Sequence, residues 1–116
     1  MSEKIRIGNT GENLAADFLQ KNGYEIVARN YRYKHAEIDL IAKQNNVLVF
    51  VEVKTRSLTS FGEPEAFVDA KKAAKIFEGA EQYTYQNNWN GNIRFDIVSV
   101  KLGVSTEIVH FEDAIH

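Results

Sequence analysis

The chain has 116 residues, of which 44% are hydrophobic and 26% charged, a composition that excludes wholesale disorder. Its 14 Lys and Arg against 16 Asp and Glu give a net charge of -2, which excludes a protein that holds nucleic acid by overall charge alone. The absence of cysteine excludes disulfides, thiolate metal sites and a cysteine nucleophile. We expect residues 1–116 to form one domain with one core.

The N-terminal half predicts a helix followed by a strand. The first residues, MSEKIRIGNTGEN, lack the apolar stretch of a signal peptide, and no apolar run approaches the ~20 residues of a membrane span. We therefore expect a cytoplasmic protein that does not enter membranes. Thr10 is expected to cap a helix that runs to about Asn22 and stops at Gly23. Its predicted inward face carries Leu14, Ala15, Phe18 and Leu19, and a strand from Tyr24 to about Tyr33 follows.

The remaining elements predict an α/β fold in the order α-β-β-β-α-β-β. Two strands between residues 36 and 56 precede a loop from Thr55 to Glu65. A helix from about Asp69 to Tyr85 comes next, with Ala70, Ala73, Ala74 and Phe77 expected to face inward. Strands at Ile93–Val100 and Ile108–Phe111 complete the chain. The strand, helix, strand succession predicts a parallel crossover, and hence a mixed sheet flanked by helices.

Residues 36–56, AEIDLIAKQNNVLVFVEVKTR, place acidic residues inside two apolar strands. With Asn45 and Asn46 at the tip of a tight turn, Gln44 pairs with Val47. Counting outward pairs Asp39 with Glu52 and Glu37 with Lys54. Because side chains alternate along a strand, these four residues are expected on one face, and a second set on the other. That second set is Ile38, Leu40, Val51 and Val53.

Two carboxylates directly opposite one another repel unless a positive charge lies between them. Asp39 and Glu52 therefore predict a Mg²⁺ or Mn²⁺ site, since these ions prefer oxygen ligands and keep several waters. Lys54, expected on the same face, would hold an attacking water or neutralise a scissile phosphate. The alternative is purely structural: Glu37 and Lys54 form a surface ion pair, and the other two acids lie at a solvated end of the sheet.

Four segments together resemble the YraN-like family of small bacterial proteins, itself similar to the PD-(D/E)XK nucleases and their Holliday-junction-resolvase branch. The segments are GENLAADFLQKNGYEIVARNYR, AEIDLIA, LVFVEVKTR and FGEPEAFVDAKK. The resemblance implies a restriction-endonuclease-like α-β-β-β-α-β core. It also implies Asp39 and Glu52 as metal ligands, Lys54 as the catalytic lysine, and Glu12 approaching from the first helix. For Glu12, the alternative is an ordinary acid in the first turn of that helix, where the helix dipole stabilises it.

Basic and aromatic residues alternate just before the Asp39 strand, in the run RNYRYKH from Arg29 to His35. Basic side chains hold phosphates, and aromatic rings stack on unpaired bases. We therefore expect Arg29, Arg32, Arg56 and Lys71 to contact DNA, with Lys72 and Lys75 extending the patch. The alternative is that Tyr31 and Tyr33 pack within the protein and that the lysines form a solvated helix face.

The sequence thus predicts a metal-dependent endonuclease that hydrolyses DNA phosphodiester bonds, with branched or structured DNA among the candidate substrates. Because the net charge is -2, a homodimer or a DNA-repair partner is expected to supply further contacts. The rival hypothesis is a non-catalytic DNA- or protein-binding scaffold that keeps the nuclease fold.

Overall fold

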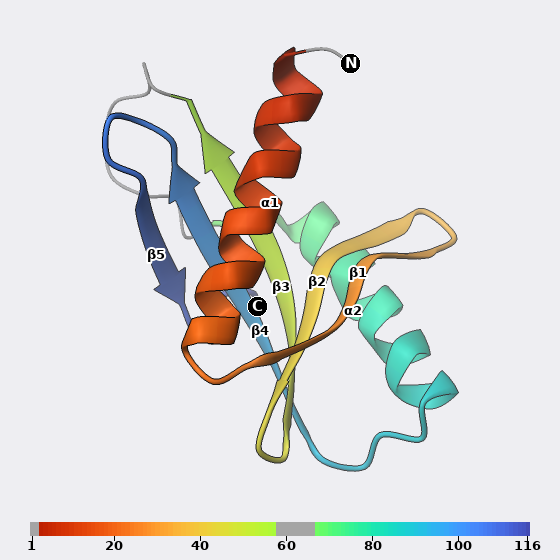
Figure 1. Ribbon diagram of the computed structural model, residues 1–116. Helices are drawn as coiled ribbons and strands as arrows, with labels where there is room; N and C mark the ends of the chain where they lie inside the picture. Colours follow the sequence, from red (N-terminus) through yellow and green to blue (C-terminus); the bar gives the residue numbers. More distant parts are fainter. Residues whose placement is uncertain (1–2, 58–66) are drawn as a thin grey trace.

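The computed structural model describes residues 3–57 and 67–116, which form two helices and five strands (Figure 1). In chain order these are α1 (Glu3–Lys21), β1 (Glu25–Tyr33), β2 (Ala36–Gln44), β3 (Val47–Arg56), α2 (Ala70–Gln86), β4 (Asn92–Lys101) and β5 (Glu107–Phe111). The predicted order α-β-β-β-α-β-β is confirmed. Most of the loop predicted from Thr55 falls on residues 58–66, outside the described ranges, while Thr55 and Arg56 belong to β3.

The prediction that the first helix begins at Thr10 is wrong, because α1 begins at Glu3. Thr10 therefore lies inside the helix and does not cap it. A helix interior tolerates Gly8 and Thr10 at a cost of about 1 kcal/mol or less each. The expected end is confirmed: Gly23 has a φ of 90°, which glycine adopts at little cost.

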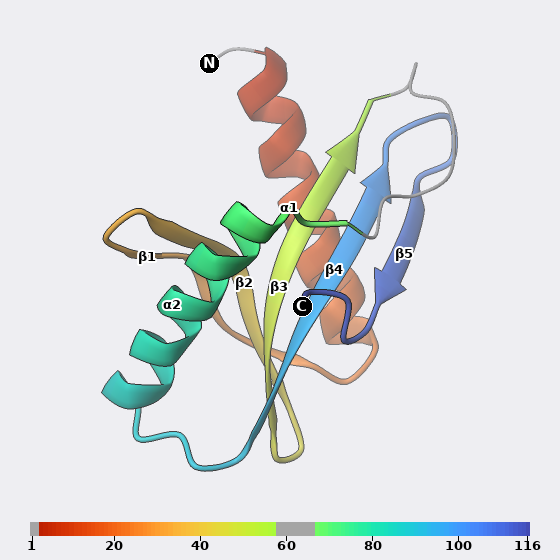
Figure 2. The same cartoon turned by 180° about the vertical axis from the view of Figure 1, so that it is seen from behind.

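The sheet is mixed, as predicted, and its strands lie in the order β1-β2-β3-β4-β5. Only β3 and β4 pair in parallel, and the chain passes between them through α2. Helix α1 covers one face of the sheet and α2 the other (Figures 1 and 2). This arrangement confirms the expected restriction-endonuclease-like core. No helix in the described part of the chain is both long and apolar enough to cross a membrane.

The predicted register of the β2–β3 hairpin is confirmed from the turn to the Leu40–Val51 pair, and the predicted Glu37–Lys54 pair lies beyond the described ladder. Asn45 has a φ of 56° at the turn, and the ladder runs from Gln44↔Val47 to Leu40↔Val51. Asp39 and Glu52 are the next residues outward on the two strands. The hairpin is therefore held by backbone pairing up to the acids, where the paired ladder ends.

The predicted side-chain faces are correct for the apolar residues of this hairpin except Ile38. Leu40, Val51 and Val53 pack on the α1 side, whereas Ile38 packs against α2. Asn30, which lies opposite Asp39 in the β1–β2 register, has a φ of 51° and departs from extended backbone. At Asn30, side chains therefore stop alternating strictly between the two faces of the sheet. The closed end of the β1–β2 hairpin lies toward α2 (Figure 2).

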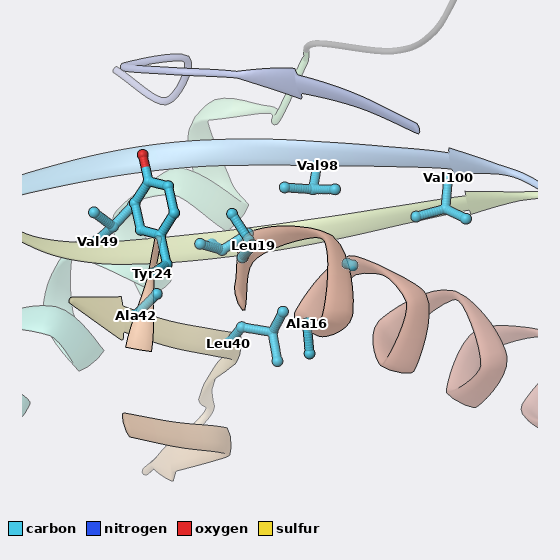
Figure 3. Close-up of a cluster of buried hydrophobic side chains, with 10 residues drawn as sticks. Ala16, Leu19, Tyr24, Leu40, Ala42, Val49, Val98 and Val100 are labelled. Atoms are coloured by element: carbon cyan, nitrogen blue, oxygen red, sulfur yellow. The ribbon is translucent and has the colours of Figure 1, made fainter. Parts of the chain in front are cut away.

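Two apolar clusters, one on each face of the sheet, form the core. The α1-side cluster joins Ala15, Ala16 and Leu19 to Tyr24 and to valines and other apolar residues of the central strands (Figure 3). On the α2 side, Phe50 and Ile97 pack against the helix. That helix buries Ala73, Ile76, Gly79 and Ala80, so the prediction that Ala70 and Ala74 face inward is wrong. Gly79 lies close to the sheet on this buried face, since a Cβ there would lie 3.2 Å from Ile38.

Candidate functional site

Asp39 and Glu52 lie side by side at the point where β2 and β3 stop pairing. The Asp39 carboxyl is within hydrogen-bonding reach of Glu52, and its Oδ2 accepts a bond of 2.8 Å from the Val53 amide. The side chain of Asp39 is thus bound to the main chain of β3 just beyond the last backbone pair of the hairpin. The two acids are fixed by the strands on which they lie, because the register of the hairpin determines their separation.

Both acids are withdrawn from water, and this changes the chemistry of Asp39. The Glu52 side chain is 5% exposed, and Asp39 is partly buried. Burial and, next, the charge of Glu52 raise the pKa of Asp39 to about 7, against the opposing effect of the Val53 hydrogen bond. The alternative in which these acids lie at a solvated end of the sheet is therefore wrong. Near neutral pH, the site therefore disfavours the state in which Asp39 and Glu52 are both ionised.

Lys72, in the first turn of α2, forms an ion pair with Glu52 across the space between sheet and helix. Burial disfavours the ammonium form, yet the hydrogen bond and charge of Glu52 raise the pKa of Lys72. A cation in the first turn opposes the helix dipole, and this turn carries no acid inside the helix to compensate. The negative charge that stabilises the Lys72 ammonium therefore comes from the acids of the sheet.

A cavity of about 480 Å³ opens over this group. Its acidic side comes from the strands, and α2 contributes a basic side and Ile76. The lining residues are His35, Glu37, Asp39, Glu52, Asp69, Lys71, Lys72, Lys75 and Ile76. Asp69 caps α2 by accepting a bond of 2.8 Å from the Lys72 amide, so the helix start is held firmly beside the acids. The arrangement combines oxygen ligands for a hard cation with lysines suited to an anion.

A larger hollow of about 970 Å³ lies on the far side of α2, between Tyr33 and Trp89. Its acids, Glu78 and Glu81, are exposed residues of the helix. Trp89 donates a hydrogen bond of 2.9 Å to the Asn92 carbonyl, which anchors the end of α2. This hollow therefore lacks the buried acid pair that distinguishes the smaller cavity.

Only some of the predicted site residues meet in the cavity. Asp39, Glu52 and Lys71 do, whereas Lys54 and Glu12 are not among the residues described as lining it. Lys54 lies two residues beyond Glu52 on β3, opposite Ser99 of β4. Glu12 accepts a bond of 3.0 Å from Asn30. Because α1 begins at Glu3, Glu12 lies in the helix interior, and the explanation by a first-turn dipole is wrong.

The predicted arginines have other contacts. Arg29 donates to the Asn13 side chain at 2.6 Å, and Arg56 is the partly buried last residue of β3. Arg32 lies 3.6 Å from Glu37, its partner in the β1–β2 register. That pair differs from the Glu37–Lys54 ion pair of the structural alternative. Both of its side chains are exposed, so it contributes little to stability and leaves Arg32 accessible.

The sequence did not predict the contact between Lys72 and Glu52. Lys72 was expected only as part of a phosphate patch, and no local signal relates a helix residue to a strand 20 positions earlier in the chain. His35 also lines the cavity, although the sequence gave it no role beyond its place at the end of the run RNYRYKH. The order in which strands and helix pack, rather than any motif, brings these groups together.

Asp96 provides a contrast, since it is buried but fully compensated. Its carboxylate accepts two bonds from Arg94 at 2.9 and 2.8 Å, one from the Asp113 amide, and contacts His110 Nε2 at 2.7 Å. Burial opposes ionisation, but the bonds from His110 and Arg94 lower the pKa of Asp96. Arg94 and Asp96 thus form an internal ion pair. The Asp96 carboxyl therefore differs from that of Asp39, whose pKa is raised by burial and by the neighbouring Glu52.

Comparison with known proteins identifies the family. Residues 11–100 match the model of the Uncharacterised protein family UPF0102. The chain belongs to the UPF0102 family. The resemblance to the YraN-like family is thereby confirmed, since the two names denote one family. A UPF0102 protein of Flavobacterium psychrophilum is 44% identical over 117 residues, covering 100% of this chain and 98% of the relative. One from Cytophaga hutchinsonii is 49% identical over 98 residues, covering 84% and 87%.

Among solved structures, the chain is similar to SfsA of Pyrococcus furiosus in complex with Ca²⁺. The sequence identity is 14% and the TM-score 0.40. The match covers 97% of this chain and 65% of that longer chain.

Proposed function

We propose that this UPF0102 protein is a Mg²⁺- or Mn²⁺-dependent endonuclease that hydrolyses DNA phosphodiester bonds, with branched or structured DNA as its substrate. One observation carries the proposal. Two adjacent acids, Asp39 and Glu52, lie withdrawn from water at the end of a paired strand ladder, beneath a rim of lysines. Phosphodiester hydrolysis requires such a combination, because a hard cation and an anionic substrate must be held together.

The donor set fits a divalent metal ion. Two carboxylates in contact repel each other, and their shared environment already holds one positive charge, the Lys72 ammonium. The described residues contain no group of three or more His, Cys, Asp or Glu side chains arranged to hold a metal. A metal held by Asp39 and Glu52 would complete its coordination with water, as Mg²⁺ does in many phosphoryl-transfer sites. Bound there, it would supply Lewis acidity that withdraws charge from the scissile phosphate.

The chain's own residues would bind and orient the substrate. Lys71 and Lys75 line the cavity close to the N-terminus of α2, where both the helix dipole and their charges favour a phosphate. Lys54, next to the acids in sequence, is proposed to hold the attacking water or to neutralise the phosphate. In-line attack would release a 3′-hydroxyl and a 5′-phosphate. Glu12, Arg29, Arg32 and Arg56 remain predicted contributors around this centre.

A second function is favoured by the Lys72–Glu52 ion pair, which already compensates Glu52. A scaffold that binds DNA or a repair protein without cutting would need no more than this structural pair. The net charge of -2 agrees with either function if a second copy or a partner protein adds basic surface.

Cleavage of a DNA panel separates the two functions. Linear, flapped and four-way-junction DNA would be incubated with Mg²⁺ or Mn²⁺ and the wild type, Glu52→Gln or Glu107→Gln. Glu107 is an exposed acid of β5 and serves as the matched control. We expect Glu52→Gln to lose cleavage, by about 100-fold or more, because it removes a ligand of the catalytic metal, and Glu107→Gln to retain it. Equal cleavage by both variants would contradict the nuclease assignment, and DNA binding without cleavage by the wild type would favour the scaffold.

A further inference from the structure

The position of Lys72 is unusual for a surface lysine, because its backbone is fixed and its charge is directed inward. Its main-chain amide donates to Asp69 at the helix cap, and its ammonium pairs with Glu52 on β3. This ammonium therefore lies against Glu52 and beside Asp39, in the cavity where a metal ion would be held.

The two members of the ion pair differ in their freedom to move. The Lys72 side chain is 48% exposed, whereas that of Glu52 is 5% exposed on β3, where Glu52 pairs with Ile97 of β4. A lysine has four rotatable side-chain bonds and a strongly hydrated head, so its ammonium can leave for water or for the mouth of the cavity. The buried side chain of Glu52 cannot move into water in this way. A cation that enters the site therefore replaces the Lys72 ammonium, and the Glu52 carboxylate stays in place.

A divalent cation and the ammonium compete for the same oxygens. Like charges a few ångströms apart repel strongly where water is excluded, so both cannot remain against Glu52. Lys75 provides an internal comparison, because it lies one turn further along α2 and lines the same cavity. The part of the chain that the structure describes gives Lys75 no ion pair with either acid.

We propose that Lys72 is the resident counter-ion of the Asp39–Glu52 site, and that a divalent cation binds there by displacing its ammonium from Glu52. The proposal rests on the metal site of the proposed function and adds its regulation. Lys72 holds the acid pair together without metal and lowers the affinity of the free protein for the ion. An anionic group that takes up the released ammonium would favour metal binding in return, because such coupling is reciprocal.

The test is a calorimetric titration of Mn²⁺ into the full chain, compared for wild type, Lys72→Met and Lys75→Met. We expect Lys72→Met to bind Mn²⁺ at least about tenfold more tightly than wild type, since the competing charge is gone. Lys75→Met removes the same charge from the same helix and is expected to change the affinity by no more than about threefold.

Removing Lys72 leaves Glu52 without its partner, so folding must be kept separate from binding. Lys72→Gln keeps a hydrogen-bond donor without the charge and is expected to bind as tightly as Lys72→Met. Lys72→Arg keeps the charge and is expected to bind as weakly as wild type. If wild type binds Mn²⁺ and the uncharged variants bind equally or more weakly, the counter-ion role is overturned while the metal site stands. If no variant binds Mn²⁺, the metal site itself is refuted.

Discussion

Replacing Asp39 with asparagine is predicted to stabilise the protein above neutral pH. The folded state raises the pKa of Asp39 from 3.8 to about 7, so folding favours the protonated acid. One pKa unit corresponds to about 1.36 kcal/mol, and the shift of about 3 units therefore corresponds to about 4 kcal/mol of stability lost when Asp39 ionises. The asparagine side chain of the Asp39→Asn variant would carry no charge, and its oxygen would still accept the Val53 hydrogen bond.

The sign of the pH dependence follows from proton binding. Between pH 3.8 and about 7 the folded state holds a proton on Asp39 that the unfolded state has released. The stabilisation that protonated Asp39 gives to the folded wild type is therefore fully present below pH 3.8. It is lost as the pH rises through about 7. The stability difference between Asp39→Asn and wild type should grow from near zero at about pH 4 to as much as about 4 kcal/mol at about pH 8.

Urea unfolding at about pH 4, 6 and 8, with EDTA present to remove divalent ions, measures this difference. Asp17→Asn provides the control, because Asp17 is an exposed residue of α1. Its effect is expected to stay within about 0.5 kcal/mol at every pH. If Asp39→Asn has the pH dependence of wild type, or is less stable at the highest pH, then Glu52 does not crowd Asp39 and the description of the site is wrong.

Two further predictions concern the other face of the sheet. Asp96→Asn is expected to cost about 3 kcal/mol near neutral pH by urea unfolding, because Arg94 and His110 lose a buried carboxylate. Since the pKa of Asp96 is lowered, its contribution to wild-type stability is present above its unfolded pKa and lost at lower pH, so an equal cost at about pH 2.5 would refute this assignment. Gly11→Ala is expected to cost about 1–3 kcal/mol, because the new Cβ would collide with Oγ1 of Thr55. Thr55→Ala in the same chain should recover most of that loss in thermal unfolding, and no recovery would contradict the proposed contact.

The hairpin register was predictable because a short turn and a two-residue side-chain period leave little choice. Asn45 and Asn46 identified the turn, and counting outward put Asp39 opposite Glu52. The face of Ile38 was not predictable in this way, since the irregular residue Asn30 lies on the neighbouring strand. Local sequence patterns predict how two neighbouring strands pair. They do not predict an irregularity that a third strand introduces.

The helices show the same limit. The apolar face of α1 was predictable, yet its start was not, because Thr10 has the chemistry of a cap whether or not the backbone uses it. For α2, the helix was predictable and its rotation was not. Gly79 lies on the buried face of α2, close to Ile38, and Lys72 of the same helix pairs with Glu52. The two acids of the candidate site were thus accessible from sequence, whereas their counter-ion depended on tertiary packing.

Anomalous diffraction from a crystal soaked in Mn²⁺ tests the central claim most directly, because it locates the ion rather than its effects. We predict a Mn²⁺ peak at the carboxylates of Asp39 and Glu52, with the Lys72 ammonium turned away from Glu52. A crystal at saturating Mn²⁺ with no peak at these carboxylates, and with Lys72 still paired to Glu52, would contradict it.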